Sequence, residues 1–152
     1  MFRVALLSRW HVHAQAPDER YVKELLKQPD CAVTCVWDRD EQVAREWGAQ
    51  YGVPYFTDLE AVLSRDDVDG VLVTSMASDH REIFIAAANH KKHIFTEKVL
   101  ALTSEDCETV EAAVAKAGVG FTISMPHKTM APHNAVKAVV DSGELGKINY
   151  LR

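Results

Sequence analysis

The sequence predicts an α/β fold, in which a doubly wound parallel sheet lies between two layers of helices in a three-layer α-β-α arrangement. Short runs of β-branched and apolar residues alternate along the chain with longer segments of helical periodicity. Parallel strands need crossover connections, which are right-handed and usually helical. Six such strands suit the order 3-2-1-4-5-6, in which a dinucleotide lies across the carboxyl ends of the strands. A five-stranded, flavodoxin-like sheet is the nearest structural alternative.

The first half of the chain contains four of the predicted strands. In order, the elements are strand 4–7, a helix opened by Pro17, strand 32–37, helix 41–51, strand 53–56, helix 58–63 and strand 70–74. The continuous apolar run from Val4 to Leu7 indicates a strand buried on both faces. Pro17, Asp18 and Glu19 are typical of a helix start, where proline is tolerated and acidic groups face the positive end of the dipole.

The second half continues the alternation. We expect a helix over 79–89, a strand over 93–96, a helix over 104–117, a strand over 119–124, a helix over 132–141 and the start of a strand over 148–152. Thr103 and Asp106 have the spacing of a capping box, and Gly118 is expected to end that helix.

Composition excludes several classes of protein. The chain has 152 residues, 47% of them hydrophobic, which suits one globular domain. Its net charge of −5 comes without a basic stripe, so we expect no nucleic-acid partner. No apolar run approaches the roughly 20 residues that span a bilayer, so we expect no membrane partner. Cys31, Cys35 and Cys107 lack CxxC spacing, which favours a reducing compartment and predicts a cytoplasmic location.

The loop after the first predicted strand lacks the glycines that usually let backbone amides approach a pyrophosphate. Ser8 lies 30 residues before Asp38, against about 20 in the usual fingerprint. A longer loop allows a phosphate contact of different geometry, through His11, Arg9 or backbone amides. We assign Ser8, Trp10 and His11 to a cofactor site on this basis. Alternatively, the loop binds no phosphate and packs Trp10 over the sheet.

Asp38 ends the second predicted strand, where a carboxylate can accept both ribose hydroxyls of an adenosine. Its charge would repel a 2′-phosphate, which favours NAD over NADP as the cofactor. The adjacent Arg39 is also assigned to the site, because it could pair with such a phosphate and weaken that preference. Alternatively, Asp38 only caps the helix that starts near Glu41.

Glu97 and Lys98 follow the fifth predicted strand, at the same edge of the sheet as Asp38. A lysine beside a nicotinamide cation and away from bulk water is expected to have a lowered pKa. It could then exchange the hydroxyl proton of a substrate as hydride moves. Judged by residue type alone, Lys98 would be an ordinary solvated lysine.

Several stretches of the chain match one family in register and spacing. They are residues 36–40, 51–54, 57–60, 67–71, 92–98, 100–103 and 141–148. These stretches resemble the glucose–fructose oxidoreductase and inositol dehydrogenase family, Gfo/Idh/MocA, over almost the full length of the chain. The resemblance implies a Rossmann-type domain that binds NAD or NADP, in a dehydrogenase that acts on sugars, inositols or related polyols.

The resemblance also implies roles for single residues. Asp38 would bind the adenosine ribose. Glu97 and Lys98 would lie against the cofactor, and Lys98 would transfer the proton. The turn after the fourth strand lines the cofactor in this family. In this chain the turn region contains Ser75, Met76, Ala77 and His80. The family's Glu-Lys-Pro reads Glu-Lys-Val here, so no cis peptide bond is expected between Lys98 and Val99.

The resemblance further implies a two-domain subunit. Residues 1–125 would form the dinucleotide-binding domain. Residues 126–152 would be the crossover helix and first strand of a truncated second domain, which supplies the substrate contacts and the oligomer interface. We therefore interpret the chain as the cofactor half of an oxidoreductase with a small sugar- or polyol-like substrate, expected to be a homo-oligomer when full length.

Two other functions stay open. A non-catalytic dinucleotide-binding module would need Asp38 but not Lys98. A metal-dependent hydrolase is suggested by His11 and His13, which resemble the H-x-H motif of amidohydrolase barrels and could reach one zinc ion. However, 152 residues are fewer than such a barrel needs, and no further metal ligands stand out in the sequence. We therefore assign no metal site.

Overall fold

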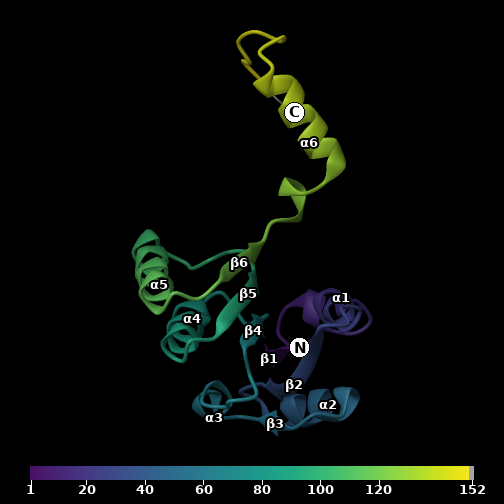
Figure 1. Ribbon diagram of the computed structural model, residues 1–152, viewed down its shortest axis with the longest axis vertical. Coiled ribbons are helices and arrows are strands. Elements are labelled where there is room, and N and C mark those ends of the chain that lie inside the picture. The colour runs from purple at the N-terminus through teal and green to yellow at the C-terminus, as the bar shows by residue number, and fades with distance from the viewer. Residues whose placement is uncertain (151–152) are drawn as a thin grey trace.

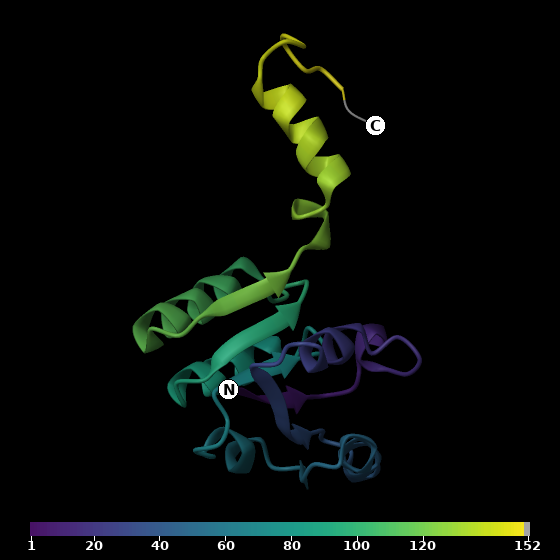
Figure 2. The ribbon, with the colours of Figure 1, turned by 45° about the vertical axis from the view of Figure 1, so that its right-hand side comes forward.

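The computed structural model describes residues 1–150, which form a six-stranded parallel sheet with helices on both faces and an extended C-terminal arm (Figure 1, Figure 2). The strands are β1 (Phe2–Leu7), β2 (Cys31–Trp37), β3 (Tyr55–Phe56), β4 (Gly70–Val73), β5 (His93–Glu97) and β6 (Phe121–Ser124). Their order is β3-β2-β1-β4-β5-β6, and all neighbouring pairs are parallel. The predicted fold class and strand order are therefore confirmed, and the five-stranded alternative is wrong.

The helices form the outer layers of the fold. They are η1 (Val12–Ala14), α1 (Arg20–Leu26), α2 (Glu41–Tyr51), α3 (Leu59–Leu63), α4 (His80–Asn89), α5 (Ser104–Ala117), η2 (Pro126–Lys128) and α6 (Ala131–Asp141), where η denotes a 3₁₀ turn. Helices α1 and α2 cover one face of the sheet, and α3, α4 and α5 cover the other (Figure 1). Helix α6 extends away from the sheet with its side chains exposed (Figure 2). None of the helices in residues 1–150 is both long enough and apolar enough to cross a membrane.

Strand β1 is buried on both faces, as its apolar run predicts. Val4 and Leu6 pack in a cluster with Trp47 of α2 on one side of the sheet. Ala5 and Leu7 belong to the cluster on the other side. Because successive strand side chains point to opposite faces, both helical layers are anchored to the same central strand.

Two helices begin and end where the sequence predicts. The Asp40 side chain caps α2, and Gly52 ends this helix in the left-handed region, with φ 68°. The Thr103 hydroxyl accepts a hydrogen bond from the Asp106 amide at 3.1 Å, and Gly118 ends α5 with φ 69°. These signals are local in the sequence, so they are readable without the tertiary structure.

Helix α1 begins at Arg20 rather than at Pro17, which corrects the predicted start. Glu19 adopts the left-handed region, with φ 41°. Its buried carboxylate accepts hydrogen bonds from the side chains of Arg9, at 2.9 Å, and Gln50, at 2.6 Å. This carboxylate is therefore turned inward by tertiary contacts and does not serve the first turn of a helix.

The strand predicted at the end of the chain is absent from residues 148–150, and residues 151–152 lie outside the described part. The side chains of residues 148–150 are exposed. A strand is stabilised by pairing with a neighbour, and no neighbouring strand reaches this segment in the described residues.

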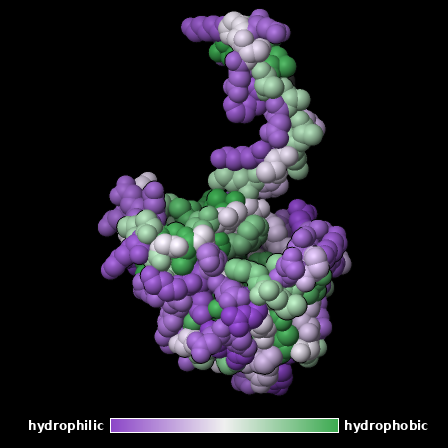
Figure 3. All heavy atoms as spheres, in the orientation of Figure 1, coloured by the Kyte–Doolittle hydropathy of each residue, from purple (hydrophilic) through white to green (hydrophobic). Residues whose placement is uncertain are grey.

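A hollow of about 520 Å³ opens between α1 and the sheet. Hydrophobic residues gather in this region, below the foot of the α6 arm (Figure 3). Its lining includes Phe2, Gly70, His93 and Gly120, which lie at or just before the amino ends of β1, β4, β5 and β6. Ligands of open parallel sheets bind at the carboxyl ends of the strands, so the candidate site lies elsewhere.

An ion pair at the amino edge of the sheet is expected to contribute to acid sensitivity. The Arg3 side chain donates to both carboxylate oxygens of Asp69, at 2.6 and 2.9 Å. These bonds hold the pKa of Asp69 at about 2, below its ordinary value of 3.8. Because the folded pKa is depressed, this stabilisation is complete above about pH 4 and is lost as the pH falls towards 2.

We expect Asp69→Asn to lower the urea midpoint of unfolding modestly at pH 7. Between pH 4 and 2, the midpoint of this variant should fall less steeply with decreasing pH than that of the native protein. Urea unfolding at several pH values measures both effects. The matched control is Asp66→Asn, which changes an exposed neighbouring carboxylate. Equal acid dependence in the native protein and the Asp69 variant would show that this pair makes no contribution.

Candidate cofactor site at the carboxyl edge of the sheet

The loop after β1 crosses the carboxyl edge of the sheet where the strand order reverses, between β1 and β4. The Ser8 amide donates to the Trp37 carbonyl at 2.7 Å, on the β2 side. The His11 amide donates to the Thr74 carbonyl at 2.9 Å, on the β4 side. The loop is therefore fixed to strands on both sides of the place where a dinucleotide binds in such folds.

Ser8 adopts a backbone conformation that glycine usually supplies. Its φ is 65°, in the left-handed region, which non-glycine residues seldom occupy. The Ser8 carbonyl also accepts a hydrogen bond from the Thr74 hydroxyl. The tight turn after β1 is thus formed without glycine, so no glycine motif marks it in the sequence.

Most amides of this loop are already bonded within the chain. The Arg9 amide donates to Asp38 at 2.9 Å, and the Ala14 amide donates to the His11 carbonyl at 2.8 Å. The His13 amide donates to the His11 ring at 3.2 Å. The Arg9 guanidinium turns away to Glu19 and Gln50. These groups are not free to cradle a phosphate, so the predicted contact through Arg9 and these amides finds no support in the geometry.

Asp38 lies at the end of β2 with its carboxylate partly exposed. One oxygen accepts from the Arg9 amide at 2.9 Å and the other from the Asp40 amide at 3.0 Å. Asp40, not Asp38, caps α2, so the capping alternative for Asp38 is wrong. Each carboxylate oxygen has a second lone pair, and Asp38 can therefore still accept hydrogen bonds from ligand hydroxyls.

A cleft of about 300 Å³ opens beside Asp38. Trp10 and Met76 line it with side chains that are 54% and 43% exposed. The loop therefore does not bury Trp10 against the sheet, as one alternative required. Arg39 also lines the cleft, and its guanidinium pairs with Glu82 at 3.2 Å. The cleft thus places the exposed side chains of Trp10 and Met76 near the Asp38 carboxylate, and Asp79 lines it as well.

The turn after β4 is only partly exposed to the cleft. Ser75 and His80 are buried, and Ala77 is half-buried. The Nδ1 atom of His80 lies 2.8 Å from the Val99 carbonyl, which requires the proton on Nδ1. The Nε2 atom is buried without a partner in the described residues. His80 therefore joins α4 to the segment after β5, beneath the surface of the site.

The peptide bond between Lys98 and Val99 is cis, so the expectation drawn from the missing proline is wrong. The rule that cis peptide bonds are largely confined to proline describes the intrinsic preference of a peptide bond. In this protein, hydrogen bonds on both sides of the bond hold the segment from Glu97 to Val99. The Glu97 carboxylate accepts from the Lys98 amide at 3.0 Å. The Val99 carbonyl is bound by the His80 ring.

Glu97 is buried at the end of β5, and Lys98 is exposed beside it. The Tyr21 hydroxyl donates to the Glu97 carboxylate and lies 2.9 Å from the Ser124 hydroxyl. Neither Tyr21 nor Ser124 was assigned to the site from the sequence. No local pattern marks either residue, because each is far from Glu97 along the chain.

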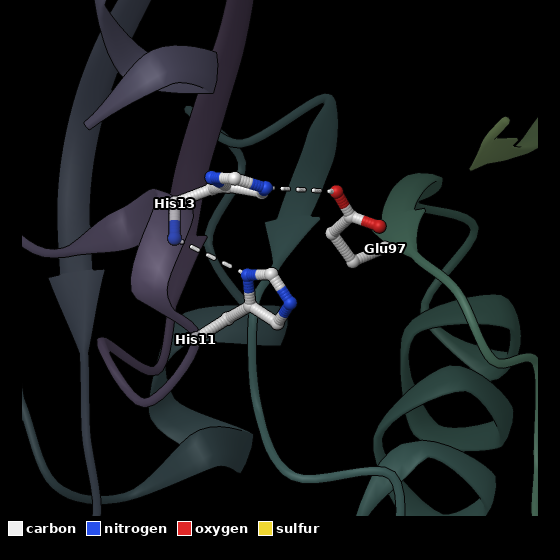
Figure 4. A group of neighbouring side chains, drawn as sticks. All are labelled: His11, His13 and Glu97. Carbon is white, nitrogen blue, oxygen red and sulfur yellow. Dashed lines mark hydrogen bonds and ion pairs between the residues drawn. The ribbon is translucent and has the colours of Figure 1, made fainter. Parts of the chain in front are cut away.

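Glu97 also meets the two histidines of the β1 loop (Figure 4). The Nε2 atom of His13 lies 4.0 Å from the Glu97 carboxylate, and the His11 and His13 rings have centroids 5.0 Å apart. Burial lowers the pKa of His11 below its ordinary value of 6.5. The sheet is open, so these histidines do not belong to an amidohydrolase barrel. Sequence reasoning did not foresee that Glu97 would join them.

Comparison with protein families gives one clear match. Residues 14–125 match the family described as "Oxidoreductase family, NAD-binding Rossmann fold". The matched range includes Asp38, Glu97 and Lys98. It begins at residue 14, after both histidines of the loop.

Curated relatives include inositol 2-dehydrogenase of Burkholderia lata, 37% identical over 117 residues, which cover 75% of this chain and 35% of that protein. The scyllo-inositol 2-dehydrogenase (NAD(+)) of Bacillus subtilis is 31% identical over 128 residues, covering 82% of this chain and 36% of the relative. The matched part of the chain thus spans about a third of the length of these relatives. Among solved structures, a 3-ketoreductase from Actinomadura kijaniata in complex with TDP-benzene and NADP has TM-score 0.82 and 26% identity, covering 97% of this chain and 45% of that one.

Proposed function

Because the chain belongs to the Gfo/Idh/MocA oxidoreductase family with an NAD-binding Rossmann fold, we propose that it is the cofactor-binding part of an NAD(P)-dependent dehydrogenase. The family match confirms the resemblance predicted from the sequence. The proposed reaction is hydride transfer between nicotinamide and a sugar- or polyol-like alcohol. Relatives named as inositol dehydrogenases and a structural neighbour named as a 3-ketoreductase support this substrate class.

The observation that carries the proposal is the position of Asp38 in the lining of the cleft. Its carboxylate keeps free lone pairs for the hydroxyls of an adenosine ribose. Trp10 and Met76 offer apolar surface for the adenine. The charge of Asp38 opposes a 2′-phosphate, and Arg39 is already paired with Glu82. We therefore propose NAD as the preferred cofactor and NADP as the weaker one.

Lys98 is the proposed proton-transfer group. A bound nicotinamide would supply the hydride acceptor or donor, and Lys98 would exchange a proton with the substrate oxygen. The side chain is exposed at the carboxyl end of β5, and its backbone is anchored to Glu97. A non-catalytic dinucleotide-binding module would have no use for a lysine at this position, so Lys98 supports an enzymatic function.

The remaining parts of the proposal concern the whole protein. We propose that residues 126–152 lead into a second domain, which binds substrate and forms a homo-oligomer. The extension of α6 away from the sheet supports this division (Figure 2). Cys31, Cys35 and Cys107 are free thiols, which supports a cytoplasmic location.

The test of the proposed function is calorimetric titration of the chain with NAD and NADP. We expect NAD to bind, and Asp38→Ala to weaken binding by about 10- to 100-fold, because a charged acceptor contributes about 1.5–3 kcal/mol to such hydrogen bonds. Asp38→Asn is expected to reduce the preference for NAD over NADP, since it removes the charge that opposes the 2′-phosphate.

Asp40→Ala is the matched control for this titration. It removes the same charge two positions away and should cost about 1 kcal/mol of stability through loss of the α2 cap, without weakening NAD binding. Thermal unfolding of each variant separates loop damage from lost ligand contacts. The proposal fails if the native chain binds neither dinucleotide, or if Asp38→Ala binds NAD as tightly as Asp40→Ala does.

A further inference from the structure

We propose that His11, His13 and Glu97 form a binding site for a divalent transition-metal ion, with zinc as the best-fitting ion (Figure 4). One nitrogen of each histidine and one carboxylate oxygen of Glu97 lie within 4.8 Å of one another. This inference goes beyond the proposed function, because dinucleotide binding needs none of these three groups to hold a metal. Both histidines also precede the range that matches the family, so the family match does not account for them.

The loop is held in place by its own hydrogen bonds. The His11 amide is bonded to the Thr74 carbonyl at 2.9 Å, and the His11 carbonyl accepts from the Ala14 amide at 2.8 Å. His13 lies in the 3₁₀ turn η1, which begins directly after His11. The two rings are thereby presented together towards the end of β5. Such support keeps ligands near their binding geometry before an ion arrives.

The hydrogen bonds of the two rings decide which nitrogen atoms can bind a metal. The Nδ1 atom of His13 lies 2.5 Å from the Asp18 carboxylate, so the proton is on Nδ1 and the lone pair is on Nε2. This Nε2 atom is the one that faces Glu97. A carboxylate behind a histidine is the usual outer support of a metal ligand. The His11 Nδ1 atom accepts from the His13 amide at 3.2 Å, so its lone pair is in use, and His11 binds a metal only when this hydrogen bond opens.

Glu97 supplies the strongest reason to expect a cation. Its carboxylate is buried, with 5% of the residue exposed. Its hydrogen-bond donors, the Tyr21 hydroxyl and the Lys98 amide, are uncharged. The Nε2 atom of His13 lies 4.0 Å from this carboxylate, and with its proton on Nδ1 the neutral His13 ring supplies no positive charge. Buried charges in proteins are usually paired or bound to metals, and a divalent ion between the rings and the carboxylate would provide that pairing.

The ligand set favours zinc over other ions. Two imidazoles and one carboxylate are the protein ligands of many catalytic zinc sites, which keep a fourth position for water or substrate. Calcium and magnesium prefer oxygen ligands, and soft ions prefer thiolates. Ligand atoms of a tetrahedral zinc ion lie about 3.4 Å apart. The candidate ligand atoms of His11, His13 and Glu97 lie up to 4.8 Å apart. On zinc binding these distances would shorten by at most about 1.4 Å, which small side-chain rotations provide.

The test is titration of the metal-free chain with Zn²⁺ by calorimetry and with Co²⁺ by visible absorption, both without dinucleotide. We expect one equivalent of ion and a cobalt spectrum of tetrahedral type. His11→Gln and His13→Gln should each weaken binding by about 100-fold or more, because loss of a ligand exceeds the roughly 10- to 100-fold effect of losing an outer partner. Asp18→Asn, which removes only the outer partner, should weaken binding by about 10- to 100-fold.

The control is the double variant His127→Gln/His133→Gln. It removes another neighbouring histidine pair, with ring centroids 4.9 Å apart, on the exposed arm. This variant should bind zinc and cobalt as the native chain does. The two single loop variants test the site without changing the buried Glu97, and circular dichroism establishes that each variant is folded.

The metal site is disproved if the native chain binds no ion, or if folded His11→Gln and His13→Gln bind zinc as the native chain does. Loss of binding in the control variant alone would place the ion on the arm and would equally overturn the proposal. The NAD titration is a separate measurement, so failure of the metal site and failure of the cofactor site are distinguishable.

Discussion

Replacing Lys98 by methionine is expected to lower turnover by about 10²- to 10⁴-fold, the usual contribution of a general acid or base. Methionine keeps an unbranched side chain but cannot exchange a proton with the substrate oxygen. The backbone at this position is anchored to Glu97 through an amide hydrogen bond that the substitution leaves in place. NAD affinity should therefore change little, so that kcat falls while the Kd of the cofactor is retained.

The measurement needs a form of the protein that converts substrate, since residues 1–152 alone are expected to show little or no turnover. Lys116→Met is the matched control, because it removes an exposed lysine on α5. Unchanged kcat in the Lys98 variant would mean that another group transfers the proton. A variant with weakened NAD binding and normal kcat would instead make Lys98 a cofactor-positioning residue.

Phe84→Ala is expected to cost about 3–5 kcal/mol of stability, the usual range for truncating a buried phenylalanine. Phe84 is fully buried in α4. Its ring packs edge-on against Phe121 of β6, with centroids 5.2 Å apart, and lies 4.7 Å from the ring of His80. Truncation leaves a cavity between the helix and the sheet that neighbours fixed in the core cannot fill.

Urea unfolding followed by circular dichroism measures this effect. Phe84→Leu should cost much less, under about 1.5 kcal/mol, because most of the volume is retained. Leu102→Ala, at an exposed position, should stay within about 0.5 kcal/mol of the native chain. A loss below about 1 kcal/mol for Phe84→Ala would mean that α4 is not packed against the sheet as described.

The cofactor edge of the site could be predicted in part from the sequence. Asp38 ends a strand and Lys98 follows one, and parallel strands bring their carboxyl ends to one edge of the sheet. The alternation of strands and helices is therefore sufficient to place both residues on the same edge. The role of the loop after β1 could not be predicted, since it depends on which amides are free and where the Arg9 side chain turns.

The amino-acid sequence by itself determined the fold class, the strand order and the limits of α2 and α5. These features depend on residue periodicity and on caps within one helical turn, such as Asp40, Gly52 and Thr103. Both partners of such interactions lie within a few positions of each other, so their patterns can be recognised directly in the sequence.

The tertiary structure alone decided where α1 begins and which groups surround Glu97. Glu19 is turned inward by Arg9 and Gln50, and Tyr21 reaches Glu97 across 76 positions of the chain. His13 meets the same carboxylate although no local pattern links them. The contacts of Tyr21 and His13 with Glu97 form only when separate β-α units pack side by side in the sheet, so no short window of sequence contains both partners.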